Sequence, residues 1–151
     1  MKIQAMLLGA LLSLSAPLVA AESEVDAAIE YRQGVYRAME WNLSRMAAMV
    51  QGRVAFDEAD FARRAERIAM LGHILPEGFV LTSPRGEAAK TRASYRIWEA
   101  RDRFDELMSE MQVRSRALQQ ATVEGQERDD LRPLLGRLAQ SCKACHDKFR
   151  D

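Results

Sequence analysis

The stretch that decides the fold spans residues 29–52 and reads IEYRQGVYRAMEWNLSRMAAMVQG. Large apolar side chains recur in it every seven residues, with methionines between them, which is the inward stripe of a bundle helix. Ser23 with Asp26 offers a start signal for this helix, and Gly52 offers a stop. The stripe consists of Ile29, Tyr36, Met39, Leu43, Met46 and Val50.

The same spacing predicts a second helix, which Asp57 caps and which Gly72 and Pro76 end. The connection over residues 75–90 holds two prolines and two glycines, and it is longer than most links inside a bundle. The expected inward residues of the second helix are Phe61, Ala65, Ile68 and Leu71.

Two more helices are expected in the C-terminal half. One runs from about Thr91 to Ala121, and the last begins near Asp129 or Asp130, with Pro133 in its first turn. Strand-like alternation is not evident in the sequence. Four helices with mostly short links predict an all-α fold, an antiparallel four-helix bundle.

Composition agrees with one such domain. The 151 residues include 48% hydrophobic and 29% charged side chains, and Ala and Leu are abundant, as helices favour. Because 22 basic residues balance 22 acidic ones, no overall field points to nucleic acid or to an anionic membrane.

The N-terminus reads as an export signal. Lys2 precedes a nearly continuous apolar run over residues 5–19 that leads into Ala20 and Ala21. We therefore expect residues 1–21 to be removed and residues 22–151 to form the mature domain outside the cytoplasm, in the periplasm. A retained membrane anchor is the alternative, but Pro17 and the acids that follow the run disfavour a spanning helix.

The strongest chemical motif is Cys142-Lys143-Ala144-Cys145-His146, the pattern of c-type haem attachment. On a helix, residues three and four apart share a face, so both sulfurs can reach the haem vinyl groups while the imidazole meets the iron. A disulfide or redox dithiol fits an oxidising compartment, but such dithiols follow a strand at a helix N-terminus. A zinc site would need a fourth ligand, for which His73 is the obvious donor, and a chance match is the last alternative.

With its motif near the C-terminus of an exported four-helix chain, the sequence resembles the class II cytochromes c, the cytochrome c-prime family. The matching segments are RQGVYRAMEWN at 32–42, TRA at 91–93, Ile97-Trp98 and CKACHDKFR at 142–150. The resemblance implies one covalent haem c per chain, attached through Cys142 and Cys145, with His146 as the axial iron ligand. It also implies haem contacts by Arg32, Gln33, Lys90 and Thr91, and a basic residue, Arg150, on the His146 side.

The sixth iron position decides the function. Arg32, Tyr36 and Met39 share one side of the first helix, and an arginine suits a haem propionate. In the resembled family, a methionine three residues after the Gln gives six-coordinate members, and here Tyr36 stands in that slot. We expect an open iron beneath an aromatic lid, although tyrosine can itself ligate haem iron and Met39 is a rival ligand.

These residues predict a five-coordinate, high-spin haem protein that binds nitric oxide and carbon monoxide, transfers single electrons, or does both. The alternatives are a low-spin electron carrier with Met39 on the iron and a haem-free helical module with or without a bound metal. Catalysis is not expected, because no catalytic triad, phosphate loop or paired acid-base carboxylates stand out. The resemblance also implies a homodimer through the first two helices, and the redox partner is unknown.

Overall fold

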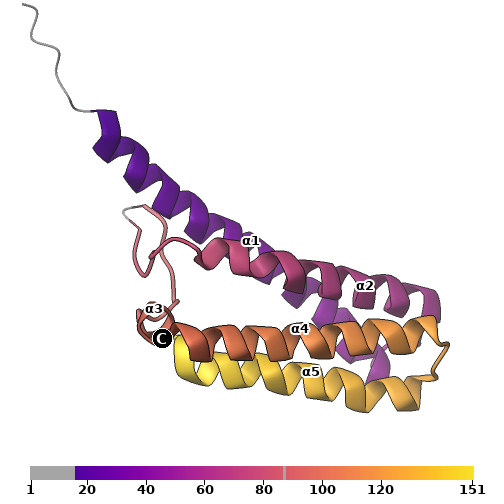
Figure 1. Cartoon of the computed structure of the whole chain (residues 1–151). Helices are drawn as coiled ribbons and strands as arrows, with labels where there is room; N and C mark the ends of the chain where they lie inside the picture. The colour runs from indigo at the N-terminus through magenta and orange to yellow at the C-terminus, as the bar shows by residue number, and fades with distance from the viewer. Residues whose placement is uncertain (1–15, 87) are drawn as a thin grey trace, which may run out of the picture.

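Residues 16–86 and 88–151 are described by the structure, a computed structural model, with side chains from residue 24 onward. Its four long helices are α1 (Ala16–Val50), α2 (Glu58–Ile74), α4 (Arg101–Val123) and α5 (Arg128–Phe149). They run alternately in opposite directions, which confirms the antiparallel four-helix bundle (Figure 1). Two short elements, η1 (Leu75–Phe79) and α3 (Arg96–Glu99), lie between α2 and α4.

The predicted helix boundaries at Gly52 and Asp57 are confirmed. Gly52 and Gly125 have φ of 70°, the left-handed conformation that lets the chain turn after α1 and α4. The Asp57 side chain accepts a hydrogen bond from the Asp60 N–H, as a cap should. Pro133, expected in the first turn of the last helix, lies in the second turn of α5, because that helix begins at Arg128.

The core lies where the four long helices meet. α4 packs against α2 and α5, while α1 packs against α2 and η1. Along α1, Tyr36 and Leu43 are only half-buried because they line a cavity. The fully buried members of the stripe are Ile29, Met39, Met46 and Val50, and those of α2 are Phe61, Ala65 and Ile68.

The expected start of the third helix at Thr91 was wrong, whereas the helix itself is present as α4. Residues 91–95 are irregular, α3 is a single turn, and the chain breaks at Ala100 (φ −118°, ψ 51°) before α4 begins. Main-chain groups of this segment bond the C-terminal end instead: the Ser94 N–H donates to Phe149 O, and the Asp151 N–H donates to Arg92 O, each at 2.9 Å. These long-range bonds replace the local ones that a helix would make.

The start of α1 also differs from the expectation. The helix begins at Ala16, upstream of Ser23, and Asp26 does not cap it. The Asp26 carboxylate accepts hydrogen bonds from the main-chain N–H groups of Ala88 and Ala89, so it holds the connection against α1. Residues 1–15 of the predicted export signal lie outside the described residues. Along the part of the chain that is described, no helix is long and apolar enough to cross a membrane.

Candidate functional site

The two thiols and the imidazole occupy the last turns of α5. Cys142 and Cys145 are half-buried and both thiols are free, so the disulfide alternative is not realised. Burial raises the pKa of the Cys142 thiol, and burial together with Cys142 raises the pKa of Cys145 to about 11. Both sulfurs are therefore protonated at neutral pH, as thiols and not thiolates.

The imidazole of His146 faces the same space. Partial desolvation lowers its pKa, as does the positive charge of Arg150 and of Arg92, while Asp147 opposes the shift. The neutral ring keeps a nitrogen lone pair that can bind a metal. Its helical hydrogen bond is intact, because the Arg150 N–H donates to His146 O at 3.2 Å.

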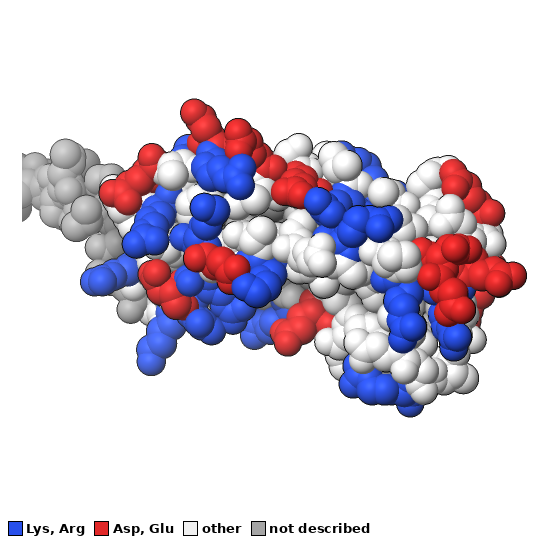
Figure 2. Space-filling model, turned by 90° about the horizontal axis from the view of Figure 1, so that it is seen from below, with Lys and Arg blue, Asp and Glu red and all other residues white. Residues whose placement is uncertain are grey.

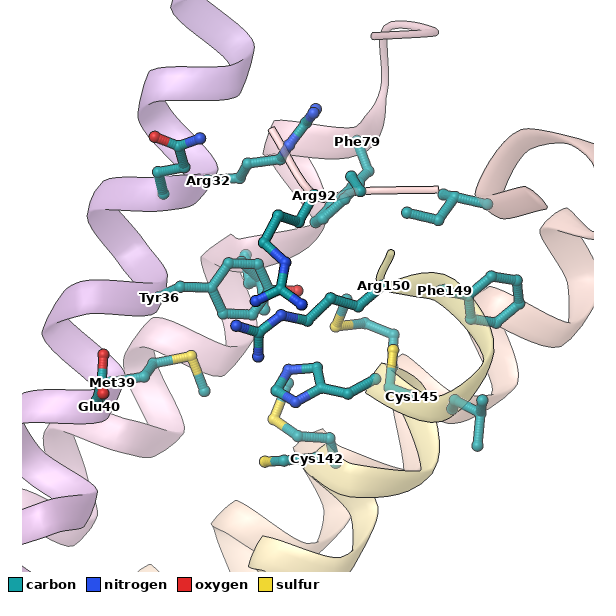
Figure 3. A pocket seen from close by; sticks show the side chains of 18 of the residues that line it. Arg32, Tyr36, Met39, Glu40, Phe79, Arg92, Cys142, Cys145, Phe149 and Arg150 are labelled. Atoms are coloured by element: carbon teal, nitrogen blue, oxygen red, sulfur yellow. The ribbon is translucent and has the colours of Figure 1, made fainter. Parts of the chain in front are cut away.

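The opposite wall comes from α1. The Tyr36 ring meets the His146 ring edge-on, with centroids 6.5 Å apart and planes at 66°, and it packs similarly on Phe79 at 6.4 Å. Burial is the main cause that raises the pKa of Tyr36, so the side chain is a neutral phenol. Met39, one turn further along α1, is 4% exposed (Figure 3).

Between these walls lies a cavity of about 600 Å³, within the range of small-molecule and cofactor sites. It brings together most of the predicted site residues. Cys142, Cys145 and His146 line one side, Tyr36 and Met39 the other, and the rest of the lining is largely apolar. Those apolar residues are Leu43, Leu75, Phe79, Ala93, Ile97, Phe104, Leu107, Met108, Met111 and Phe149.

This arrangement fits a covalently held haem. The flat macrocycle needs an apolar space, two thiols on one helix face and a nearby neutral imidazole, and all of these meet in the cavity. A zinc site is not supported, since no group of three or more potential metal-binding side chains forms within 16–86 and 88–151. His73 is exposed at the end of α2 and does not line the cavity.

Arg32 lines the cavity but its guanidinium is directed at the connection. One terminal nitrogen donates to Gly78 O at 3.2 Å and to the Ser83 hydroxyl at 2.6 Å. The other donates to Ser83 O at 2.7 Å and to the Thr91 hydroxyl at 3.0 Å. The guanidinium also lies over the Phe79 ring at 5.1 Å. Arg32, which is 1% exposed, therefore anchors the connection to α1.

Two other predicted haem contacts, Gln33 and Lys90, also lie where the connection meets α1. Gln33 lines the cavity and its side-chain amide donates to the main-chain oxygen of Lys90, whose side chain is exposed and lies outside the lining. Gly78 packs so closely that an added Cβ would lie 2.7 Å from the Cβ of Arg32. Only glycine fits there, so this close approach requires the residue that the sequence has.

Sequence reasoning missed two contributors. Phe79 falls in a segment expected to be an irregular connection, yet it is 2% exposed and contacts both Tyr36 and Phe104. Arg92 lies within the quoted TRA segment, but nothing in its spacing indicated that it lines the cavity. Both residues lie between α2 and α4, where helical periodicity gives no indication of which side chains face the cavity.

Comparisons with known proteins show the family of the chain. The family model described as cytochrome C' matches residues 27–150. A cytochrome c' from Halomonas halodenitrificans is 34% identical over 130 residues, which cover 85% of this chain and 98% of the relative.

Solved structures show the same fold. The cytochrome c prime of Shewanella frigidimarina superposes with a TM-score of 0.77 at 32% identity, covering 84% of this chain and 96% of that one. A nitric oxide complex of a point mutant of cytochrome c prime from Alcaligenes xylosoxidans gives 0.73 at 27% identity, covering 84% and 96%. The chain therefore belongs to the cytochrome c' family, whose cofactor is covalently bound haem c.

Proposed function

We propose that Cys142 and Cys145 form the thioether links to the haem, that His146 is its axial ligand, and that the position opposite His146 is left without a protein ligand. The observation that carries this proposal is the Tyr36 ring, which faces the imidazole across the cavity at 6.5 Å. A bulky ring there fills the approach to the second axial position. The result is a five-coordinate, high-spin haem protein that binds nitric oxide and carbon monoxide.

Tyr36 is better suited to be a lid than a ligand. Tyrosine ligates iron as a phenolate, and burial opposes loss of the phenol proton. The ring is held by an edge contact with Phe79. An incoming molecule must displace the ring, so small, strongly binding diatomics are favoured over larger or weaker ligands.

When bound, haem c supplies an iron with an open coordination position and a one-electron couple. The protein supplies the selectivity. Apolar side chains make up most of the cavity lining, and Tyr36 restricts its distal side. The relative solved as a nitric oxide complex supports gas binding as a function of this chain.

Electron transfer is the second candidate function, with or without gas binding. The observation that favours its six-coordinate form is that Met39, whose thioether can ligate haem iron, lines the same cavity as His146 (Figure 3). Met39 is also packed in the core, which accounts for its burial without ligation.

Titration of the reduced protein with nitric oxide and with carbon monoxide tests gas binding directly. We expect saturable absorbance changes with both gases at one equivalent per chain, with nitric oxide bound more tightly. If neither gas changes the spectrum, the open-site proposal is wrong and electron transfer through a six-coordinate iron takes its place.

We also propose that the mature protein is a periplasmic homodimer joined through α1 and α2. Large apolar side chains on these helices remain exposed, including Trp41 at 60% and Met70 at 58%. Sedimentation velocity on the haem-loaded protein, with Trp41→Ala as the variant, checks this. We expect a dimer that the substitution weakens, and a monomer at all concentrations would contradict it.

A further inference from the structure

Four aromatic rings connect the wall of the cavity to the surface at α3. Tyr36 and Phe79 line the cavity, and their ring centroids lie 6.4 Å apart. The Phe79 ring lies 6.5 Å from the Trp98 ring, which lies 6.5 Å from the Tyr95 ring. Phe79 is 2% exposed, whereas Tyr95 is 54% exposed. The chain of rings therefore begins at the cavity and ends in solvent.

The single turn of α3 holds the two outer rings together. Tyr95 and Trp98 are three residues apart, so they lie on the same side of the turn. The Trp98 N–H donates a hydrogen bond to Tyr95 O at 3.0 Å. The Ser94 N–H donates to Phe149 O, which ties this segment to the end of α5. The backbone thus constrains how far the outer rings can separate.

Trp98 is suited to pass an electron on, and not to remain oxidised. Tyrosine and tryptophan are the aromatic side chains that lose an electron most readily. The Nε1–H of Trp98 is buried and has no hydrogen-bond partner within residues 16–86 and 88–151, so no described group takes its proton when the indole is oxidised. The Arg32 guanidinium lies 5.9 Å from the centroid of the same ring and disfavours a lasting positive charge there.

The two tyrosines of the chain differ in where their proton can go. Oxidation of a phenol at neutral pH is favourable only when the proton leaves with the electron. Water can take that proton from the exposed Tyr95. Burial is the main cause that raises the pKa of Tyr36, so its proton stays in place. An oxidising equivalent that leaves the cavity is therefore most stable at Tyr95.

We propose that Trp98 and Tyr95 form a relay that carries single electrons from the surface to the haem when hydrogen peroxide oxidises the haem. This inference rests on the haem site and the open iron position of the proposed function. Hydrogen peroxide takes up two electrons and two protons and leaves as two water molecules. Each passage through the relay returns one electron, while the Tyr95 phenol releases one proton to water and becomes a neutral radical. Two passages therefore balance one peroxide.

The surface around Tyr95 fits a small anionic reductant that restores the phenol. Among residues 90–99 the exposed charged side chains are Lys90, Arg92 and Arg96 against Glu99. Figure 2 shows several Lys and Arg side chains on the left half of one face, the half that holds α3 and the C-terminal end in Figure 1. Positive side chains raise the local concentration of an anion such as ascorbate, which gives the radical one electron and one proton.

Peroxide treatment of the haem-loaded protein without a reductant tests the relay. Two Tyr95 radicals on different chains then join through a carbon–carbon bond, so that two phenols and one peroxide give one dityrosine and two water molecules. Peptide mass spectrometry locates the cross-link, and a nitroso spin trap with electron paramagnetic resonance detects the radical. The haem-free chain treated in the same way shows whether the reaction needs the haem.

The variants separate the two members of the relay. Tyr95→Phe removes the phenol, and Trp98→Phe keeps an aromatic ring that is harder to oxidise. Trp98→Tyr disturbs the packing in the same way but supplies an oxidisable ring. Tyr31→Phe is the matched control, because Tyr31 is 37% exposed and pairs with no other aromatic ring in the described part of the chain. Trp41, at 60% exposed, is the internal reference for oxidation that follows exposure alone.

We expect a cross-link through Tyr95 that needs both peroxide and haem and that added ascorbate suppresses. Tyr95→Phe should abolish it, Trp98→Phe should remove most of it, Trp98→Tyr should restore part of it, and Tyr31→Phe should leave it unchanged.

Three results would overturn the relay: no cross-link in the haem-loaded protein, a cross-link that Trp98→Phe leaves at full yield, or oxidation of Trp41 and Tyr31 to the same extent as Tyr95. A low-spin, six-coordinate spectrum of the untreated sample would instead overturn the proposed function.

Discussion

The two walls of the cavity differ in how they determine the site. The α5 wall is chemical: Cys142, Cys145 and His146 must be those residue types at those spacings. The α1 wall is steric, because Tyr36 and Met39 act through size and packing. A motif search finds the first wall and overlooks the second, although in the proposed function the second wall decides what the iron binds. We therefore expect substitutions in the α5 wall to abolish haem attachment and substitutions in the α1 wall to change stability or ligand affinity.

The largest effect is expected from the α5 wall. Changing both Cys142 and Cys145 to Ser should abolish covalent haem, because the serine hydroxyls cannot form the thioether links. Intact-protein mass spectrometry and haem staining after denaturing electrophoresis measure this. His73→Ala is the control, since His73 does not line the cavity, and it should retain full staining. A stained band from the double Ser variant would show that the attachment lies elsewhere.

The next largest effect is expected from Arg32, which joins α1 to the long connection. Arg32→Ala removes four hydrogen bonds from a buried guanidinium, and Gly78, Ser83 and Thr91 lose their partner. We expect the free energy of unfolding to fall by about 2–4 kcal/mol.

Denaturant unfolding followed by circular dichroism is the measurement. Arg37→Ala, at an exposed position of the same helix, is the matched control and should change the value by less than about 0.5 kcal/mol. Equal losses in the two variants would mean that the Arg32 anchor contributes nothing particular.

A smaller effect should separate the ring of Tyr36 from its hydroxyl. Tyr36→Ala removes the ring that an incoming ligand must displace, and with it an edge contact with Phe79 worth about 0.5–1.5 kcal/mol, so carbon monoxide affinity should rise by up to about tenfold. Tyr36→Phe keeps the ring and should leave the affinity near that of the unmodified protein. Carbon monoxide titration of the reduced proteins compares them. Weaker binding by Tyr36→Ala would refute the lid.

The smallest effect is expected at Met39. Met39→Leu conserves volume in the core and should cost less than about 1.5 kcal/mol of stability, with no change in the visible spectrum. Absorption spectra of the oxidised and reduced variants record it. A change of spin state on this substitution would identify Met39 as the sixth ligand and make the α1 wall chemical after all.

The sequence predicts the α5 wall and the bundle because their causes are local. Helical periodicity, the caps at Asp57 and Gly52, and the spacing of Cys142 and Cys145 all operate within a few residues. The family resemblance adds Tyr36 in the distal slot, and the structure places it opposite His146.

The conformation of residues 91–95 and the contacts of Arg32 and Arg92 could not be predicted from the sequence, because they depend on partners far away in the chain. Thr91 and Ser94 leave the helical conformation for partners in α1 and at the C-terminus, which lie more than fifty residues away in the chain. Arg32 is predicted to contact the haem because its charge suits a propionate, and its hydrogen bonds to oxygen acceptors of the folded connection could not be predicted from spacing. Arg92 lies in the segment that the Ala93–Arg150 bridge joins to the C-terminal end, a contact that local spacing does not indicate.

The coordination state of the iron shows whether the position opposite His146 is open or is filled by a protein ligand. The absorption spectrum of the oxidised protein from the visible to the near infrared, with electron paramagnetic resonance of the same sample, measures it. We predict high-spin, five-coordinate iron with His146 as its protein ligand and Tyr36 unbound. A low-spin spectrum with a methionine-to-iron charge-transfer band would contradict the account and place Met39 on the metal.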